Sequence, residues 1–444
     1  MSSEKSCMIL GAGIAGVTAA IGLKKLGFGV TLFYKRRPFT AYEGFSEKTK
    51  EGLLSSGCSR ASRLLEIESV RNSNWAEASK KINYEYVVCR DALDRALLED
   101  AGSSGVVCVE ATVVGGIDCS EARPKVGYKY NGRHFEAAAD FIVDARGRFT
   151  PFKEAYVCGP KSFSILQELE IEAMDEKRTS IDSTQDGWVW QAYVGDKRGY
   201  VQFTCDESTA ATVNSFDDLL GLLTRQNAEL WSLKSAKPVK RIVKRDAYSK
   251  LHREIINEKM MLVGDAASSI DPLSGNGAFQ AMSMSSIAPF VVNTILEGSA
   301  DEKQTAIDFY KERVRFIFDK FSKVGRDFYR LEQRYESGFW QDRQSWPSEV
   351  SVGVQTLPRI EKRAVVKVPN IHAMEVVITK SNPMGVCFYG DLEVVGLARF
   401  CIENTTERSL AYFNDFCREQ GLSAGTAGQL EKWLFSQDFL ADTA

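Results

Sequence analysis

The sequence lacks the cysteine and histidine patterns of a metal site. Its ten cysteines form no CxxC pair, and their spacings match no zinc motif. Its three histidines, His134, His252 and His372, are too scattered to suggest a metal centre. We therefore expect no metal, and we expect reduced, mostly buried thiols, as in a cytoplasmic protein.

An excess of one charge and long apolar runs are also missing. There are 56 basic and 59 acidic residues, and this net charge of −3 argues against a general nucleic-acid binder. The opening stretch MSSEKSCMILGAG leads directly into an apolar strand without the apolar core of a signal peptide. No later stretch reads as long enough to span a bilayer. The sequence therefore predicts a cytoplasmic protein with no membrane partner.

The N-terminal region has the pattern of a β-α-β unit. Residues 6–11 read as a buried strand, 14–26 as a helix and 29–34 as a second strand. Such a unit places helices against a parallel sheet. The fold class that we expect is therefore α/β, with a Rossmann-type nucleotide-binding domain.

A glycine fingerprint lies between the first strand and the helix. The stretch ILGAGIAG contains Gly11, Gly13 and Gly16 in the order G-x-G-x-x-G, with Ala15 in the first helical turn. Gly11 permits the tight turn, Gly13 lets the backbone approach a pyrophosphate, and Gly16 lets the helix pack against the sheet. The strand-turn-helix context therefore predicts a dinucleotide site at the helix N-terminus.

The acidic residue that usually ends the second strand is absent. The stretch GFGVTLFYKRRPF has Tyr34, Lys35, Arg36 and Arg37 at the candidate positions. The usual carboxylate contact with the ribose is therefore missing or rebuilt. Lys35 and Arg36 are candidates to approach the adenosine side or a 2′-phosphate, so the fingerprint alone leaves FAD and NADP open.

A second motif, MMLVGDAASSIDPLSGNGAFQAM, favours FAD. A strand ends at Gly264 and Asp265, and we expect a buried carboxylate there whose partner is a sugar-like hydroxyl. A loop made rigid by Pro272 then opens a helix whose N–H groups suit an electron-rich flavin edge. The candidate flavin-binding residues here are Gly264, Asp265, Pro272, Gly275, Asn276 and Gly277.

This motif resembles the second FAD motif of flavin-dependent aromatic monooxygenases and halogenases, in which the aspartate binds the ribityl chain. The resemblance covers residues 6 to about 340. It implies that Arg90, in VVCRDALDRALLEDA, lies near the FAD pyrophosphate. It also implies that Asp144 and Gly147, in FIVDARGRFT, match a D-x-x-G segment close to FAD, and that EGFSEKT (43–49) approaches the flavin.

The halogenase pattern itself is incomplete. Halogenases carry W-x-W-x-I-P, whereas GWVWQAYV has Trp188 and Trp190 followed by Ala192 and Tyr193. We interpret the two tryptophans as packing residues of a strand. Halogenation also needs a lysine; Lys80 and Lys81 lie in the right part of the chain, but a solvated surface is the favoured interpretation for both.

The whole set of motifs most resembles the halogenase-like flavoproteins of the LodB/GoxB/QhpG type, which modify a tryptophan of a partner protein to make a quinone cofactor. That resemblance implies an FAD-dependent monooxygenase that hydroxylates a tryptophan in the precursor of a tryptophylquinone-containing oxidase or dehydrogenase. NAD(P)H or a flavin reductase would supply electrons. No catalytic residue can be nominated, because indole is electron-rich and the flavin supplies the chemistry.

Other functions stay open. One is a flavin-dependent halogenase of tryptophan or phenols, and a related one is a hydroxylase of small aromatic molecules. Another is a non-catalytic flavoprotein that acts as a maturation chaperone. A lipid reductase of the geranylgeranyl-reductase type is disfavoured by the lack of a membrane-facing amphipathic stretch.

The chain divides into three predicted regions. Residues 1–154 and 246–354 form the FAD-binding domain with its following helices, which we expect over 277–296 and 302–336. Residues 155–245 have the alternating pattern of an inserted antiparallel-sheet substrate domain. Residues 355–444 read as a C-terminal α+β extension that could dock a protein partner, with strands at 363–368, 374–379 and 385–389 and helices at 406–419 and 427–437.

Overall fold

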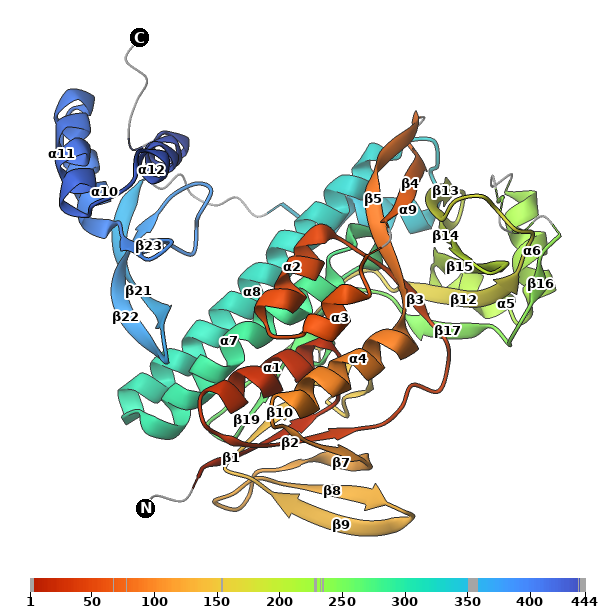
Figure 1. Ribbon diagram of the computed structural model, residues 1–444. Helices are drawn as coiled ribbons and strands as arrows, with labels where there is room; N and C mark the ends of the chain where they lie inside the picture. Colours follow the sequence, from red (N-terminus) through yellow and green to blue (C-terminus); the bar gives the residue numbers. More distant parts are fainter. Residues whose placement is uncertain are drawn as a thin grey trace. The chain divides into compact units, whose positions relative to one another are not determined.

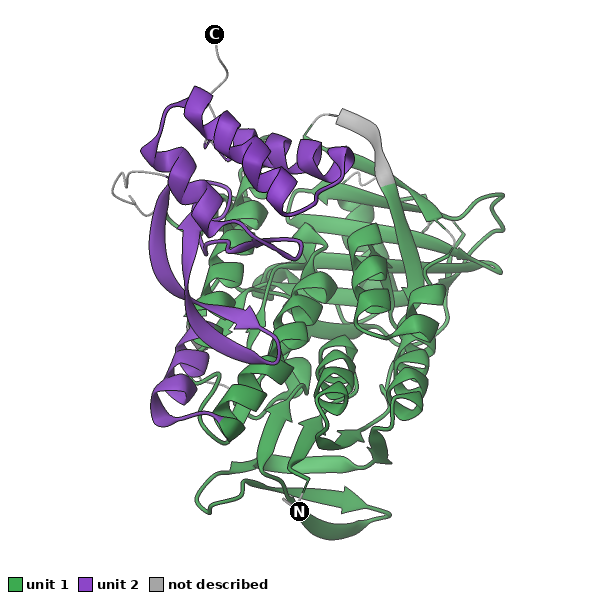
Figure 2. Cartoon of the chain, turned by 60° about the vertical axis from the view of Figure 1, so that its left-hand side comes forward, with its two compact units in different colours: residues 1–297, 310–348 green, residues 298–309, 349–444 purple. Residues whose placement is uncertain are grey.

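The computed structural model describes residues 4–66, 68–76, 78–152, 155–226, 230–231, 233, 235–349, 358–437 and 439. The chain forms two compact units (Figure 2). The first contains residues 1–297 and 310–348, and the second contains residues 298–309 and 349–444.

A parallel sheet forms the nucleotide-binding part of the first unit, in the order β19-β10-β1-β2-β6. Its strands are β1 (Ser6–Leu10), β2 (Gly29–Tyr34), β6 (Val107–Glu110), β10 (Phe141–Asp144) and β19 (Met260–Leu262). Apolar residues fill β1 and β10 on both faces, as a sheet covered on both sides requires. The predicted α/β class and Rossmann-type domain are confirmed.

Three helices pack together beside this sheet. Helix α1 (Ile14–Lys25) lies beside α4 (Arg90–Ser103) and α7 (Gly277–Glu297) (Figure 1). A Cβ added at Gly22 of α1 would lie 2.5 Å from Pro289 of α7, so the close approach of these two helices depends on glycine. This packing brings the start of α7 and the start of α1 to the same side of the sheet, where the strands end.

A three-stranded meander packs against β2. It contains β7 (Thr112–Asp118), β8 (Lys125–Tyr130) and β9 (Arg133–Ala138), and the ring of Phe33 in β2 lies 4.9 Å from that of Tyr128. The predicted NG turn joins β8 to β9, with φ of 47° at Asn131 and 77° at Gly132.

Helix α7 corrects one expectation from the sequence. It has 21 residues, and by length and composition it is apolar enough to cross a membrane. In the structure, 61% of its most apolar window is buried inside the protein. A core helix passes the same test, so this single helix is weak evidence for a membrane. The expectation that no stretch is long enough was nevertheless wrong.

A nine-stranded sheet forms the rest of the first unit, in the order β16-β12-β15-β14-β13-β4-β5-β3, with β17 also paired to β12. Its middle strands pair antiparallel as expected, but β13 and β4 are parallel. The strands are β3 (Tyr42–Phe45), β4 (Glu68–Trp75), β5 (Ala78–Cys89), β12 (Phe163–Glu170), β13 (Arg178–Thr184), β14 (Gly187–Gly195), β15 (Arg198–Cys205), β16 (Lys237–Pro238) and β17 (Val243–Asp246). Three of them therefore come from the first 90 residues, outside the region in which the sequence predicted this sheet.

The two faces of the nine-stranded sheet are buried by different partners. Helices α5 (Glu207–Thr212) and α6 (Phe216–Arg225) share one apolar core with it. On the other side, Tyr329 near the end of α8 (Ala300–Leu331) and Trp340 of α9 (Gly338–Ser345) pack with Trp188 and Trp190 of β14. The remaining elements are α2 (Glu47–Ser55), α3 (Ser59–Arg63), η1 (Gly147–Phe149), β11 (Ala155–Cys158), β18 (Lys250–His252), η2 (Gly264–Ala266), β20 (Ser268–Ser269) and η3 (Pro272–Ser274).

The second unit has its own apolar core. Its elements include β21 (Arg359–Lys367), β22 (Asn370–Ile378), β23 (Phe388–Tyr389), β24 (Leu392–Glu393), α10 (Val395–Glu403), α11 (Thr406–Glu419) and α12 (Ala424–Ser436). Helix α11 matches the predicted range, whereas α10 was not predicted. Residues 350–357, where the predicted extension begins, lie outside the described part of the chain.

Candidate functional site

A cavity of about 1860 Å³ lies in the first unit. It is lined by the ends of β1, β2 and β10, by the starts of α1, α4 and α7, and by residues of β3, β5 and β14. Pockets for small ligands usually measure about 300–1,000 Å³. The cavity therefore has room for an extended cofactor together with a second molecule.

The glycine fingerprint forms one wall. Gly11 has φ of +109°, and a Cβ added at Gly16 would lie 1.9 Å from the carbonyl oxygen of Gly11. Gly13 lines the cavity, and an added Cβ there would meet nothing within 4 Å. Helix α1 starts after Gly13 without a side-chain cap or an acidic residue in its first turn, which leaves its N–H groups for a phosphate. Ala15 also lines the cavity, whereas Gly16 acts behind it by permitting close packing.

The basic residues after β2 lie at the cavity. Tyr34, Lys35 and Arg36 all line it. Arg36 is paired through Nε with Glu110 of β6 at 3.2 Å, and the Tyr34 hydroxyl donates to Glu110 at 3.4 Å. Glu110 does not itself line the cavity. The neighbouring strand therefore supplies a carboxylate that holds the basic turn, and this carboxylate is not in the usual ribose-binding position.

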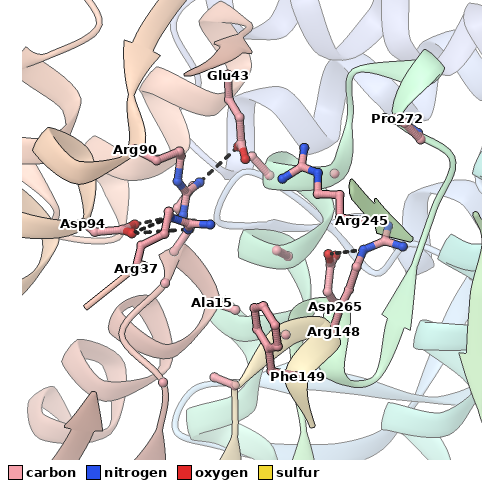
Figure 3. A pocket seen from close by; sticks show the side chains of 18 of the residues that line it. Ala15, Arg37, Glu43, Arg90, Asp94, Arg148, Phe149, Arg245, Asp265 and Pro272 are labelled. Atoms are coloured by element: carbon pink, nitrogen blue, oxygen red, sulfur yellow. Dashed lines mark hydrogen bonds and ion pairs between the residues drawn. The ribbon is translucent and has the colours of Figure 1, made fainter. Parts of the chain in front are cut away.

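Arg90 sits at the centre of an ion-pair cluster that the sequence did not reveal (Figure 3). It is buried at the start of α4, and it donates to Glu43 at 3.1 Å and to Asp94 at 2.9 Å. Arg37 also donates to Asp94, at 3.3 Å. Burial alone would raise the pKa of Glu43, but the guanidinium groups of Arg90, Arg245 and Arg37 outweigh it and lower that pKa. Arg90 lines the cavity, but the family resemblance implied only the arginine and not its partners.

Asp144 lies behind the cavity wall. Its side chain is fully buried and accepts hydrogen bonds from the Arg146 backbone at 3.0 Å, from the Arg146 guanidinium at 2.7 Å and from Thr150 at 3.0 Å. The residues of the turn that it anchors, including Gly147 and Phe149, line the cavity. Asp144 therefore positions this turn and does not itself face the space.

Asp265 differs from the sequence expectation in its exposure. Its side chain is 40% exposed and lines the cavity, so the expectation of a buried carboxylate was wrong. It is paired with Arg148 Nε at 3.2 Å (Figure 3). Gly264 before it has φ of +59°, and an added Cβ there would lie 2.8 Å from that of Ala15. Gly264 thus lets η2 approach α1 and places the carboxylate at the cavity.

If Asp265 binds the ribityl chain, Asp265→Ala should weaken FAD binding by about 1–3 kcal/mol, because a hydrogen bond to a charged group is lost. Titration of the apoprotein with FAD, followed by flavin fluorescence, measures this change. Asp319→Ala is a suitable control, since Asp319 is an exposed residue of α8 whose partner is Arg315. An unchanged dissociation constant for Asp265→Ala would show that the carboxylate does not contact the cofactor.

The loop before α7 forms the opposite part of the wall. Pro272, Gly275, Asn276 and Gly277 all line the cavity. Gly275 has φ of +63°, and added Cβ atoms at Gly275 and Gly277 would meet nothing within 4 Å. The Asn276 amide donates to the Ser274 carbonyl at 2.7 Å, which holds the loop in place. The loop and the start of α7 thus present backbone to open space, as a flat ring system requires.

Residues of the nine-stranded sheet form another part of the cavity wall. Trp188 and Trp190 both line it, so they are cavity residues as well as the packing residues that the sequence suggested. Trp188 Nε1 donates to the Tyr329 hydroxyl at 3.0 Å, and Trp190 Nε1 donates to Glu85 at 3.2 Å. The W-x-W spacing places both indoles on one face of β14. The side chains of Lys80 and Lys81 lie outside the described part of the chain.

Comparisons with known proteins agree with this geometry. A family model described as tryptophan halogenase matches residues 39–357. The tryptophan 2-halogenase of Chondromyces crocatus is 24% identical over 463 residues, which cover 96% of this chain and 83% of that protein. A digeranylgeranylglycerophospholipid reductase of Thermoplasma acidophilum is 24% identical over 337 residues, which cover 70% of this chain and 84% of that protein.

Two solved structures extend the similarity to the whole fold. The peptidyl tryptophan dihydroxylase QhpG, described as essential for tryptophylquinone cofactor biogenesis, is 31% identical, with a TM-score of 0.79 over 98% of this chain and all of that one. The flavin-dependent halogenase CmlS is 18% identical, with a TM-score of 0.70 over 90% of this chain and 89% of that one. The fingerprint, Asp265 and the loop before α7 fit FAD. The chain belongs to the tryptophan halogenase family and is a halogenase-like, FAD-dependent oxidoreductase.

Proposed function

We propose that this enzyme hydroxylates a tryptophan side chain of a precursor protein during the biosynthesis of a tryptophylquinone cofactor. The observation that carries the proposal is the full-length similarity to QhpG, a peptidyl tryptophan dihydroxylase. The cavity supports it, because the fingerprint and the two tryptophans, Trp188 and Trp190, line the same space. Such a space suits an aromatic side chain that enters beside the cofactor.

FAD, once reduced by NAD(P)H or by a flavin reductase, would activate O₂, which supplies the inserted oxygen atom. The chain's own residues bind the cofactor and orient the reacting groups. The start of α1 and Gly13 hold the pyrophosphate, and the loop from Pro272 to Gly277 supports the ring. Trp188 and Trp190 provide an apolar wall that excludes water from the reacting atoms.

Halogenation is the second candidate, and the family model favours it. Against it, Ala192 and Tyr193 replace the Ile and Pro of the halogenase pattern. Among the described side chains, the lysines that line the cavity are Lys35, which follows β2, and Lys244, which donates to Asn214 at 3.2 Å. The departure from the halogenase sequence pattern therefore favours hydroxylation.

The test is a product assay on the FAD-loaded enzyme with NADH and oxygen. The substrates are a tryptophan-containing precursor of a tryptophylquinone enzyme and free L-tryptophan, each with and without chloride or bromide. We expect mass gains of oxygen on the precursor, independent of halide and labelled by ¹⁸O₂. Efficient halogenation of free tryptophan would contradict the proposal and establish the halogenase alternative.

The same assay tests partner docking, which we assign to the second unit. Glu407 and Arg408 are exposed at the start of α11, and reversal of both charges should slow precursor turnover in a salt-dependent manner. Oxidation of NADH in the absence of precursor should stay unchanged. Equal precursor turnover by the variant and the wild type at low salt would contradict docking through this helix.

A further inference from the structure

Glu85 is a buried acidic residue at the aromatic end of the cavity. It lies in β5, is only 7% exposed, and lines the cavity beside Trp190. One of its oxygens, Oε1, accepts hydrogen bonds from the Thr179 hydroxyl and from Trp190 Nε1, the latter at 3.2 Å. Strands β13 and β14 therefore fix the carboxylate in one orientation.

The second oxygen, Oε2, lies near the backbone of Gly44 and the side chain of Arg71. It lies against the backbone of Gly44 in β3, where an added Cβ would be only 2.0 Å away. Among the described residues, its cationic neighbour is Arg71, whose Nη1 is 3.9 Å away and thus beyond hydrogen-bond range. Oε2 accepts no hydrogen bond from a described residue, and Glu85 lines the cavity, so a bound molecule could supply the donor.

The two indole N–H groups of the surrounding wall are already engaged. Trp188 Nε1 donates to the Tyr329 hydroxyl, and Trp190 Nε1 donates to the other oxygen of Glu85. The wall thus combines flat apolar faces with a buried acceptor at Glu85. This combination is complementary to a molecule that has a large aromatic surface and a single N–H donor, and indole has both.

We infer that Glu85 is a substrate-binding residue whose Oε2 accepts the N1–H hydrogen bond of the target indole. This inference rests on the proposed function, because it takes the substrate to be a tryptophan side chain. It adds a specificity determinant, since an aromatic ring without an N–H would leave Oε2 unsatisfied. Gly44 is required beside it, because any side chain there would displace the carboxylate.

The hydrogen bond would also assist the reaction. In the reaction that FAD would support, a ring carbon would bond to one oxygen atom of O₂, the O–O bond would break, and the indole would become cationic, with much of the charge at N1–H. A carboxylate at N1–H stabilises that charge until the ring carbon loses its proton to solvent. For each oxygen inserted, Ar–H, O₂, NAD(P)H and H⁺ give Ar–OH, NAD(P)⁺ and H₂O.

Binding of two probes to the FAD-loaded protein tests the inference without turnover. The probes are N-acetyltryptophanamide and its 1-methyl derivative, which lacks the N–H, and equilibrium dialysis gives their dissociation constants. A hydrogen bond to a charged group corresponds to about 10- to 100-fold in affinity, so the wild type should prefer the N–H probe by that factor. Equal affinities, or no binding of either probe up to millimolar concentrations, would overturn the inference.

Glu85→Gln is the variant of choice, since its amide oxygen can still accept from Thr179 and Trp190 while an NH₂ group replaces Oε2. We expect it to bind both probes equally, with thermal stability close to that of the wild type. Glu136→Gln, at an exposed position of β9, is the matched control and should keep the preference. If Glu85→Gln retains the wild-type preference, the assignment fails.

The outcomes separate this inference from the proposed function. Preference for the N–H probe that depends on Glu85, together with a halogenated product, would retain the indole site and reject hydroxylation. Hydroxylated precursor without that preference would retain the function and reject the role of Glu85.

Discussion

Gly16→Ala should abolish FAD binding. The new methyl group would lie 1.9 Å from the Gly11 carbonyl oxygen and 3.1 Å from the Ala145 side chain. Gly11 is held in place, because its N–H donates to the Phe33 carbonyl at 2.8 Å. Either the turn or helix α1 must shift, and both form the phosphate end of the cavity. We expect purified protein without bound flavin and with a lower melting temperature.

Gly13→Ala provides the informative contrast. An added Cβ at Gly13 meets no protein atom within 4 Å, so the melting temperature of the apoprotein should stay close to that of the wild type. FAD affinity should still fall, because the methyl group projects into the space where the pyrophosphate would approach. Gly102→Ala, in α4 and also without close neighbours, is the control for which neither property should fall. Full flavin content in Gly16→Ala would show that the fingerprint does not form the site.

Glu332→Gln should cost the protein about 3 kcal/mol of stability near neutral pH. The Glu332 side chain is fully buried and accepts from Arg334 at 2.6 Å, from Ser183 at 2.5 Å and from the Ala76 backbone at 3.1 Å. Burial alone would raise the pKa of Glu332, but these hydrogen bonds lower it from 4.5 to about 2. The contribution of the ionised Glu332 side chain to the free energy of unfolding is therefore complete above pH 4.5 and disappears as the pH falls through about 2.

Urea unfolding at a series of pH values measures this effect. The difference between wild type and Glu332→Gln should be constant near neutrality and should shrink between pH 4.5 and about 2. Glu336→Gln, four residues further along at an exposed position, is the matched control and should show no such difference. A constant difference down to the lowest pH would mean that packing, and not the charge of Glu332, carries the stability.

The site could be predicted from the sequence wherever backbone geometry within a few residues decides it. Gly11 and Gly16 are needed for one strand-to-helix turn, and the turn at Asn131 and Gly132 needs positive φ at two successive residues. The conformation of the loop from Pro272 to Gly277 is likewise set by residues within the loop. Such features depend on the conformational range of single residues, so the sequence determined the dinucleotide site, the hairpin and the motif that favoured FAD.

Only the tertiary structure decided which distant side chains meet. Glu85 meets Thr179 and Trp190 because β5 joins the sheet of β13 and β14 through β4, and strand order is invisible in local periodicity. For the same reason, the sequence could identify Arg90 but not its contact with Glu43. The alternation of apolar and polar residues along a strand shows which residues share one face of a sheet. The pairing of strands from distant segments, however, depends on the energetics of the whole fold.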